Sequence, residues 1–296
     1  MIRSVGVTDL LSSLPGVVVV LFALLTQLGD FWFTFSLSAL LYWLGAQTSR
    51  VGHGVTRERA AMVVALLAAA VAVTVSLKAV FGLPRPTGAG TAAHAALVPA
   101  SLRGVYVSMA TGDGYGFPSG HATTAVLVWG GLAWAVRVGR RRQRAAVAAG
   151  VVLVIGLSRL VIGVHFLVDV LTGFAVAGAV LWLSVTRLRT PGRVFGLATV
   201  AAAAAVLASG LTQDVAAGLG IGIGGTVAWR AVGQRLPAAT PAGARTTAAL
   251  GVGVVLTAAG VTLAVRPAPL ATGLAAAVGT ALLLVMPLAG ERLAKK

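Results

Sequence analysis

Long apolar runs alternate with short polar connections along the whole chain. Ten of these runs have a length near the roughly 20 residues that an α-helix needs to cross a bilayer. They cover residues 10–28, 31–47, 60–82, 119–136, 145–164, 166–186, 194–212, 215–231, 246–265 and 268–289. We therefore predict an all-α fold, a polytopic membrane helix bundle with ten crossings.

The composition supports this fold class. The 296 residues are 58% hydrophobic and 10% charged, whereas a soluble domain carries about 25% charged residues. The chain has no cysteine, which excludes disulfides, thiol catalysis and cysteine metal sites. Arg3 precedes the first apolar run as in a signal peptide, but the run is long and lacks a clear cleavage site. We therefore interpret it as a membrane helix.

Positive residues gather on one side of the predicted membrane. With ten crossings, both termini share a side with the loops 48–59, 137–144, 187–193 and 232–245. The opposite side keeps only five of the 23 lysines and arginines: Lys78, Arg85, Arg103, Arg159 and Arg266. The positive-inside rule assigns the basic side to the cytoplasm. The net charge of +16 is therefore an orientation signal, and we expect no nucleic-acid partner.

Three polar blocks interrupt the apolar pattern, and all fall at the outer ends of predicted helices. The first is Lys78, followed seven residues later by Arg85 and Pro86. An arginine presents a planar fork to two phosphate oxygens, and a lysine presents a compact charge. Two cations at a membrane border are the alternative. We expect the connection that follows, 83–118, to be partly ordered with short interfacial helices.

The second block is Pro118-Ser119-Gly120-His121, at the start of a predicted helix. Ser119 fits an N-cap, and Gly120 allows close approach of the backbone to a ligand. A helix N-terminus presents free N–H groups and the positive end of its dipole, which together favour phosphate. We expect His121, in the first turn, to face the same ligand. A capped helix with a surface histidine is the alternative.

The third block is Ser158-Arg159, followed by His165 and Asp169. The last two are four residues apart and share one face if the next helix has begun. A carboxylate that accepts the Nδ1 proton of a histidine fixes its tautomer and directs the Nε2 lone pair outward, as a nucleophile or base requires. A structural pair that stabilises a hairpin is the alternative.

In order and spacing, the three blocks resemble the signature of the type 2 phosphatidic acid phosphatase superfamily, over about residues 60–190. The resemblance implies a six-helix phosphatase core at 1–190. A four-helix membrane extension at 191–296 has no counterpart in that core, and its role stays open.

The resemblance also implies a role for each residue of the blocks. His165 would attack phosphorus and form a phosphohistidine, Asp169 would orient His165, and His121 would protonate the leaving group. The phosphoryl oxygens would be held by Lys78, Arg85, Ser119, Gly120 and Arg159. Because His165 must be neutral while His121 is protonated, we predict a bell-shaped pH dependence.

The implied function is a metal-independent phosphoric monoester or diphosphate hydrolase. It would act on a lipid phosphate or polyprenyl diphosphate at the extracytoplasmic face of the cell membrane. We expect no metal or cofactor, because three cations and a helix N-terminus neutralise the phosphoryl charge. The expected partners are the lipid substrate and the bilayer, and a homo-oligomer through the C-terminal helices stays open. A lipid phosphotransferase with the same site, and a transporter or scaffold without catalysis, are the alternatives.

Overall fold

The computed structural model describes residues 6–45, 55–237, 239–265 and 268–295, with the backbone alone for 257–265. Within these ranges the chain forms helices and no strand. An apolar solvent requires each backbone N–H and C=O to bond within its own segment, and a helix meets that requirement. The predicted all-α polytopic bundle is confirmed. Four residues of the charge count lie outside the described ranges: Arg3, Arg50, Arg266 and Lys296.

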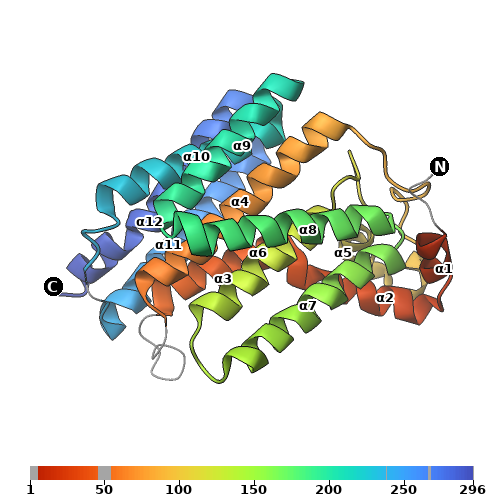
Figure 1. The fold of residues 1–296 in the computed structure, drawn as a ribbon, viewed down its shortest axis with the longest axis horizontal. Helices are drawn as coiled ribbons and strands as arrows, with labels where there is room; N and C mark the ends of the chain where they lie inside the picture. Colours follow the sequence, from red (N-terminus) through yellow and green to blue (C-terminus); the bar gives the residue numbers. More distant parts are fainter. Residues whose placement is uncertain (1–5, 46–54, 238, 266–267, 296) are drawn as a thin grey trace.

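Helix α4 (Arg57–Phe81) lies at the centre of the bundle (Figure 1). It begins after Thr56, whose side chain accepts a hydrogen bond from Arg59 N at 3.2 Å, and it ends at Gly82. Every residue from 60 to 70 is buried. Four helices pack against it: α3 (Phe31–Leu44), α6 (Gly120–Ala135), α9 (Pro191–Ser209) and α10 (Gln213–Val232).

Helix α6 also packs against two further helices of the predicted core. These are α7 (Arg141–Val161) and α8 (Leu167–Leu183), and α8 continues as a π-helical turn over Ser184–Leu188. The connection 83–118 contains 3₁₀ turns at Ala95–Leu97 and Ala100–Leu102 and the short helix α5 (Arg103–Ala110). The prediction of short helices in this connection is confirmed.

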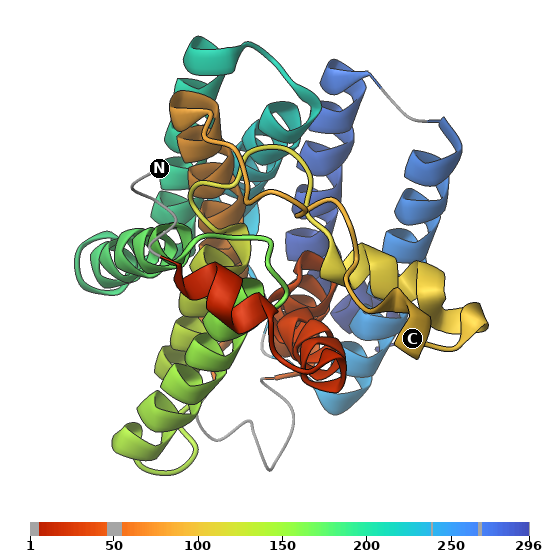
Figure 2. The same cartoon turned by 90° about the vertical axis from the view of Figure 1, so that its right-hand side faces the viewer.

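The C-terminal helices pack directly onto the core. In Figure 2, α4 (orange) lies between α8 (green) and the C-terminal pair (blue), α11 (Pro241–Val265) and α12 (Pro269–Leu293). Pro287, inside α12, has no N–H and cannot bond to Leu283 O four residues earlier. Trp43 Nε1, from α3, donates to that carbonyl at 3.1 Å. The division of the chain at residue 190 stays a prediction.

The first two predicted crossings form one element. Helices α2 (Gly16–Leu25) and α3 follow one another nearly in line (Figure 1), joined by a 3₁₀ turn at Thr26–Gly29. With 10 and 14 residues, each is shorter than the roughly 20 residues of a crossing. Together they make one candidate span, Gly16–Leu44, among seven that the described residues contain. The prediction of separate crossings at 10–28 and 31–47 is therefore wrong.

With one crossing fewer, helix α1 (Val7–Ser12) lies at the other end of the bundle from the one predicted. It lies at the same end as the third block, because Thr8 Oγ1 donates to His165 O at 3.0 Å. Helix α12 ends at the opposite end of the bundle (Figure 1). The expectation that both termini lie opposite the candidate site is therefore wrong for the N-terminal helix.

Candidate active site

The three polar blocks meet at one end of the bundle. Lys78 lies in the last turn of α4, Ser119 caps α6, and Arg159 lies in the last turn of α7. His165 follows in the connection between α7 and α8. The positive charges of Lys78, Arg85 and Arg159 all act on His165, so the blocks are close in space although they are distant in sequence.

His165 and Asp169 form the predicted pair. The turn after α7 passes through Gly163, whose φ of +76° is a conformation that glycine adopts without steric cost. Helix α8 then begins after Phe166, which places Asp169 in its first turn. Asp169 Oδ2 lies 3.4 Å from His165 Nδ1 and accepts a hydrogen bond from Phe166 N at 3.0 Å. The same carboxylate therefore caps the helix and orients the imidazole.

Arg85 fixes the tautomer of His165. Its Nη1 lies 3.1 Å from His165 Nε2. Because a guanidinium only donates hydrogen bonds, Nε2 is the acceptor and the proton is on Nδ1, facing Asp169. Arg85 also donates from Nη1 to Val164 O at 3.1 Å and from Nε to Asp113 O at 2.7 Å. The backbone on both sides of the site thus holds the guanidinium in place.

Burial keeps His165 uncharged. Its side chain is 2% exposed. Burial, reinforced by the positive charges of Arg159, Arg85 and Lys78, lowers the pKa of His165 well below its usual range. A neutral imidazole whose Nε2 carries the lone pair is the form that a nucleophilic histidine needs.

Ser119 joins the second block to the third. Its Oγ accepts a hydrogen bond from Ala122 N at 3.4 Å, which makes it the N-cap of α6 as predicted. Its own N donates to Asp169 O at 3.0 Å. Gly120 follows directly against α4, where a Cβ on Gly120 would lie 3.2 Å from Thr74 Cγ2. The N-terminus of α6 is therefore held between α4 and α8.

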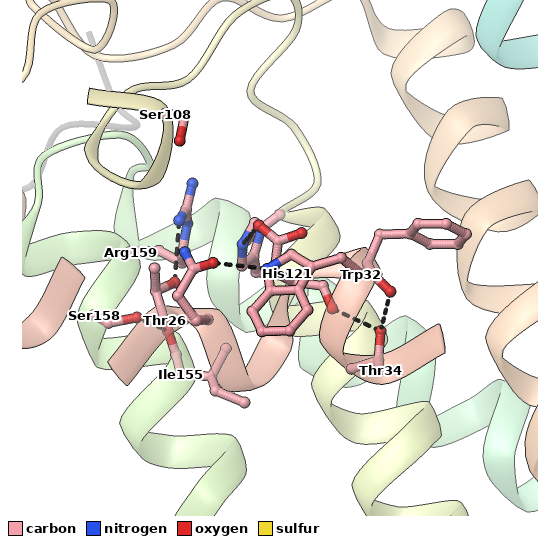
Figure 3. A network of polar contacts seen from close by, with 12 residues as sticks. Thr26, Trp32, Thr34, Ser108, His121, Ile155, Ser158 and Arg159 are labelled. Atoms are coloured by element: carbon pink, nitrogen blue, oxygen red, sulfur yellow. Dashed lines mark hydrogen bonds and ion pairs between the residues drawn. The ribbon is translucent and has the colours of Figure 1, made fainter. Parts of the chain in front are cut away.

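Arg159 and His121 face the 3₁₀ turn between α2 and α3 (Figure 3). Arg159 is 3% exposed, and its Nη1 donates to Thr26 Oγ1 at 3.1 Å. His121 Nε2 lies 3.6 Å from Asp30 Oδ2. Thr26 and Asp30, which both precede α4 in the sequence, thus contact the third and second blocks.

Three residues of the site were not predicted from the sequence: Thr26, Asp30 and Thr74. Asp30 is the one acidic residue between residues 10 and 47, and an ionisable residue in an apolar stretch marks a functional site. Between two separate crossings, however, it reads as a loop residue. Thr26 and Thr74 are ordinary in sequence, and only the packing of the helices brings them to the site.

Three buried polar atoms of the site have no hydrogen-bond partner among the described residues. They are Thr74 Oγ1, His121 Nε2 and Arg159 Nε. An unpaired buried polar group costs about 1–3 kcal/mol, so a native structure keeps few of them. These atoms, the Lys78 ammonium and the first N–H groups of α6 suit an anion with several oxygens.

The carboxylates of the site are dispersed. Asp30 faces His121 and Asp169 faces His165. Within the described ranges, no three His, Asp or Glu side chains form a group that could hold a metal ion. The polar groups that do converge are cations and imidazoles, which fit a phosphoryl group.

Comparison with known protein families agrees with this geometry. Residues 59–193 match the PAP2 superfamily. The chain is similar to the PAP2 superfamily through this segment, which covers just under half of its 296 residues. The predicted resemblance is confirmed, and PAP2 proteins are generally phosphatases. The matched segment contains all three blocks, whereas Thr26 and Asp30 precede it. The chain has no significant match among curated proteins or solved structures.

Proposed function

We propose that this protein is a metal-independent phosphatase that removes a phosphoryl group from a lipid phosphate or polyprenyl diphosphate. One observation carries the proposal. His165 contacts Asp169 at Nδ1, at 3.4 Å, and Arg85 at Nε2, at 3.1 Å. The imidazole is therefore oriented by a carboxylate, and its lone pair is directed toward a cation suited to phosphate.

In the first step, His165 Nε2 attacks phosphorus. The P–N bond forms while the P–O bond to the leaving group breaks, and His121 gives its proton to the leaving oxygen. Asp169 stabilises the positive charge that develops on the imidazole. Because the Nε2 lone pair cannot serve Arg85 and phosphorus together, Arg85 transfers its hydrogen bond to a phosphoryl oxygen as the substrate binds.

The phosphoryl oxygens are held by charge and by the start of α6. Phosphoryl transfer depends mainly on positioning and on neutralising the charge of these oxygens. The groups with this role are Lys78, Arg85, Arg159, the Ser119 hydroxyl and the Gly120 N–H.

In the second step, water releases the phosphate. His121, now neutral, accepts a proton from a water molecule whose oxygen attacks the phosphohistidine. The P–N bond breaks, its electron pair returns to His165 Nε2, and inorganic phosphate leaves. Both imidazoles are then in their starting forms.

The proposed face is extracytoplasmic. The basic loop at 137–144 connects α6 to α7, and the basic loop at 187–193 connects α8 to α9. Both loops lie at the ends of these helices that are opposite the candidate site. Their arginines favour the cytoplasm, so the site lies at the outer face.

Phosphate release by the purified protein in detergent tests the function. The substrates are phosphatidate, phosphatidylglycerophosphate and a polyprenyl diphosphate, each with EDTA present. We expect turnover of at least one, its loss in His165→Ala and its retention in the matched variant His94→Ala, which lies in the outer connection. Full turnover by His165→Ala, or turnover only when metal is added, would contradict the proposal.

A further inference from the structure

The 3₁₀ turn between α2 and α3 is fixed against the site. Trp129 Nε1, from α6, donates to Leu28 O at 3.0 Å. A Cβ on Gly29 would lie 2.6 Å from Ile155 Cγ2, so only a glycine lets the turn lie this close to α7. Contacts to α6 and α7 therefore set the position from which Asp30 reaches the site.

Asp30 supplies the one negative charge next to His121. The charged groups that face His121 are Asp30 at the start of α3, Arg159 on α7 and Lys78 on α4, with His165 near them. Arg159 and Lys78 are positive, and Asp30 is negative. An opposite charge within about 4–6 Å favours the protonated form, and Asp30 Oδ2 lies 3.6 Å from His121 Nε2.

This pair also lies on the accessible side of the site. The side chains of His121 and Asp30 are 24% and 32% exposed, whereas those of His165 and Asp169 are 2% and 0% exposed. A leaving group that is opposite the buried nucleophile departs toward this more exposed pair, although the Nε2 atom of His121 is itself buried.

We infer, on the basis of the proposed phosphatase function, that Asp30 is a positioning residue. It favours the protonated form of His121 and directs this side chain at the leaving oxygen. The helix pair α2–α3 then completes the site, although it precedes the segment 59–193 that matches the family.

The leaving group provides the test. Asp30→Asn keeps the shape and removes the charge. A lipid alkoxide needs a proton to leave, whereas a nitrophenolate does not. We expect kcat/KM of Asp30→Asn to fall about 100-fold for a lipid monophosphate and to stay within about 3-fold of wild type for p-nitrophenyl phosphate. The basic limb of the pH profile should move down by about one unit.

Two variants complete this experiment. Asp9→Asn, an exposed acid of α1, should match wild type on both substrates, and Asp30→Glu should recover most of the lipid phosphatase activity. Equal losses on both substrates, an unmoved basic limb or no rescue by Asp30→Glu would overturn the inference. An inactive wild type, or a fully active His165→Ala, would instead reject the phosphatase function itself.

A second inference comes from an apolar cavity of about 310 Å³ between α3 and the C-terminal helices. Its walls include Phe31 and Phe35 of α3, Ile221 of α10, Val255 of α11 and Leu283 of α12. The volume falls in the range of ligand pockets, about 300–1,000 Å³. Phe31 directly follows Asp30, so the cavity begins beside the accessible part of the site.

We propose that this cavity holds the hydrocarbon tail of the lipid substrate, given the proposed function. The lining is almost wholly apolar, which suits a hydrocarbon and no polar ligand. The position next to Asp30 places the tail where the leaving oxygen departs. The C-terminal helices would then select for lipid over soluble phosphates.

A variant that fills the cavity tests this proposal, and the measured quantity is the affinity for a phosphonate, not the rate of turnover. A Cβ on Gly279, which lines the cavity on α12, meets no atom within 4 Å. Gly279→Leu should therefore fold and occupy the cavity. We expect it to bind hexadecyl phosphonate about 10-fold more weakly and butyl phosphonate as wild type does.

The matched control is Gly178→Leu on α8, where a Cβ also meets no atom within 4 Å. It lies outside the cavity and should leave both affinities unchanged. Unchanged binding of the long phosphonate by Gly279→Leu, or equal losses in both variants, would overturn the proposal. Failure of wild type to bind either phosphonate would reject the anion site of the proposed function instead.

Discussion

Arg85 Nη1 lies 3.1 Å from His165 Nε2, so a cation donates a hydrogen bond to the lone pair of the proposed nucleophile. This contact holds the imidazole in the reactive tautomer. A phosphoryl oxygen that draws the guanidinium away frees the lone pair at the moment the phosphorus arrives. Binding of the substrate therefore also frees the lone pair of the nucleophile.

The geometry around Arg85 predicts that lysine cannot replace it. Three acceptors share its Nε and Nη1: Asp113 O, Val164 O and His165 Nε2. A lysine keeps the charge but not the planar fork, and each lost charge-assisted hydrogen bond costs about 1.5–3 kcal/mol. We expect kcat/KM of Arg85→Lys to fall at least about 100-fold. Arg103→Lys, in the same connection, should change it little; comparable losses in the two variants would contradict this role.

The lowered pKa of His165 predicts activity that persists into acid. His165 must be neutral to attack, so a lowered pKa moves the acidic limb of the pH profile below the usual histidine range, near 6.5. The charge of Arg159 contributes to this lowering. In Arg159→Gln the pKa of His165 should rise and the acidic limb should move to higher pH, whatever the loss in rate. A limb that stays in place or moves toward acid would show that another group controls it.

Close packing between α4 and α6 predicts that Gly120→Ala lowers activity and that a second substitution at Thr74 restores it. In Gly120→Ala, the new Cβ would lie 3.2 Å from Thr74 Cγ2 and push the start of α6 away from α4. We expect kcat/KM to fall about 10-fold. Thr74→Ser removes the methyl group and keeps the hydroxyl, so the double variant should recover to within about 3-fold of Thr74→Ser alone. Additive losses in the double variant would mean that this contact is not the cause.

Because α2 and α3 form a single span, we predict that Ser13 and Leu293 lie on opposite sides of the membrane. The chain has no cysteine, so Ser13→Cys and Leu293→Cys each introduce a unique thiol at an exposed position. A maleimide that cannot cross membranes should label Ser13→Cys in intact cells and Leu293→Cys only after permeabilisation. Labelling of both variants from the same side would contradict the single span and would support two separate crossings.

Most of the helices, and the residues of the three blocks, follow from the sequence. Lengths of apolar runs set the helices, since a hydrocarbon solvent allows the backbone few other structures. Capping and spacing placed Ser119 at the start of α6, and placed His165 and Asp169 together.

The path of the chain before α4 could not be predicted in the same way. The largely polar segment 26–30, TQLGD, fits a hairpin between two helices as well as a break inside one. The choice depends on contacts distant in sequence, such as Trp129 Nε1 to Leu28 O and Arg159 to Thr26. For the same reason the sequence did not place Asp30 beside His121, which lies 91 residues later in the chain.

Trapping of the covalent intermediate tests the central claim most directly. The protein is mixed briefly with ³²P-labelled lipid phosphate and quenched in alkali, where phosphohistidine survives, and the labelled peptide is then sequenced. The account predicts label on His165, no label in His165→Ala, and longer-lived label in His121→Ala, which lacks the base that activates water. Label on another residue, or steady turnover with no labelled protein, would contradict the account.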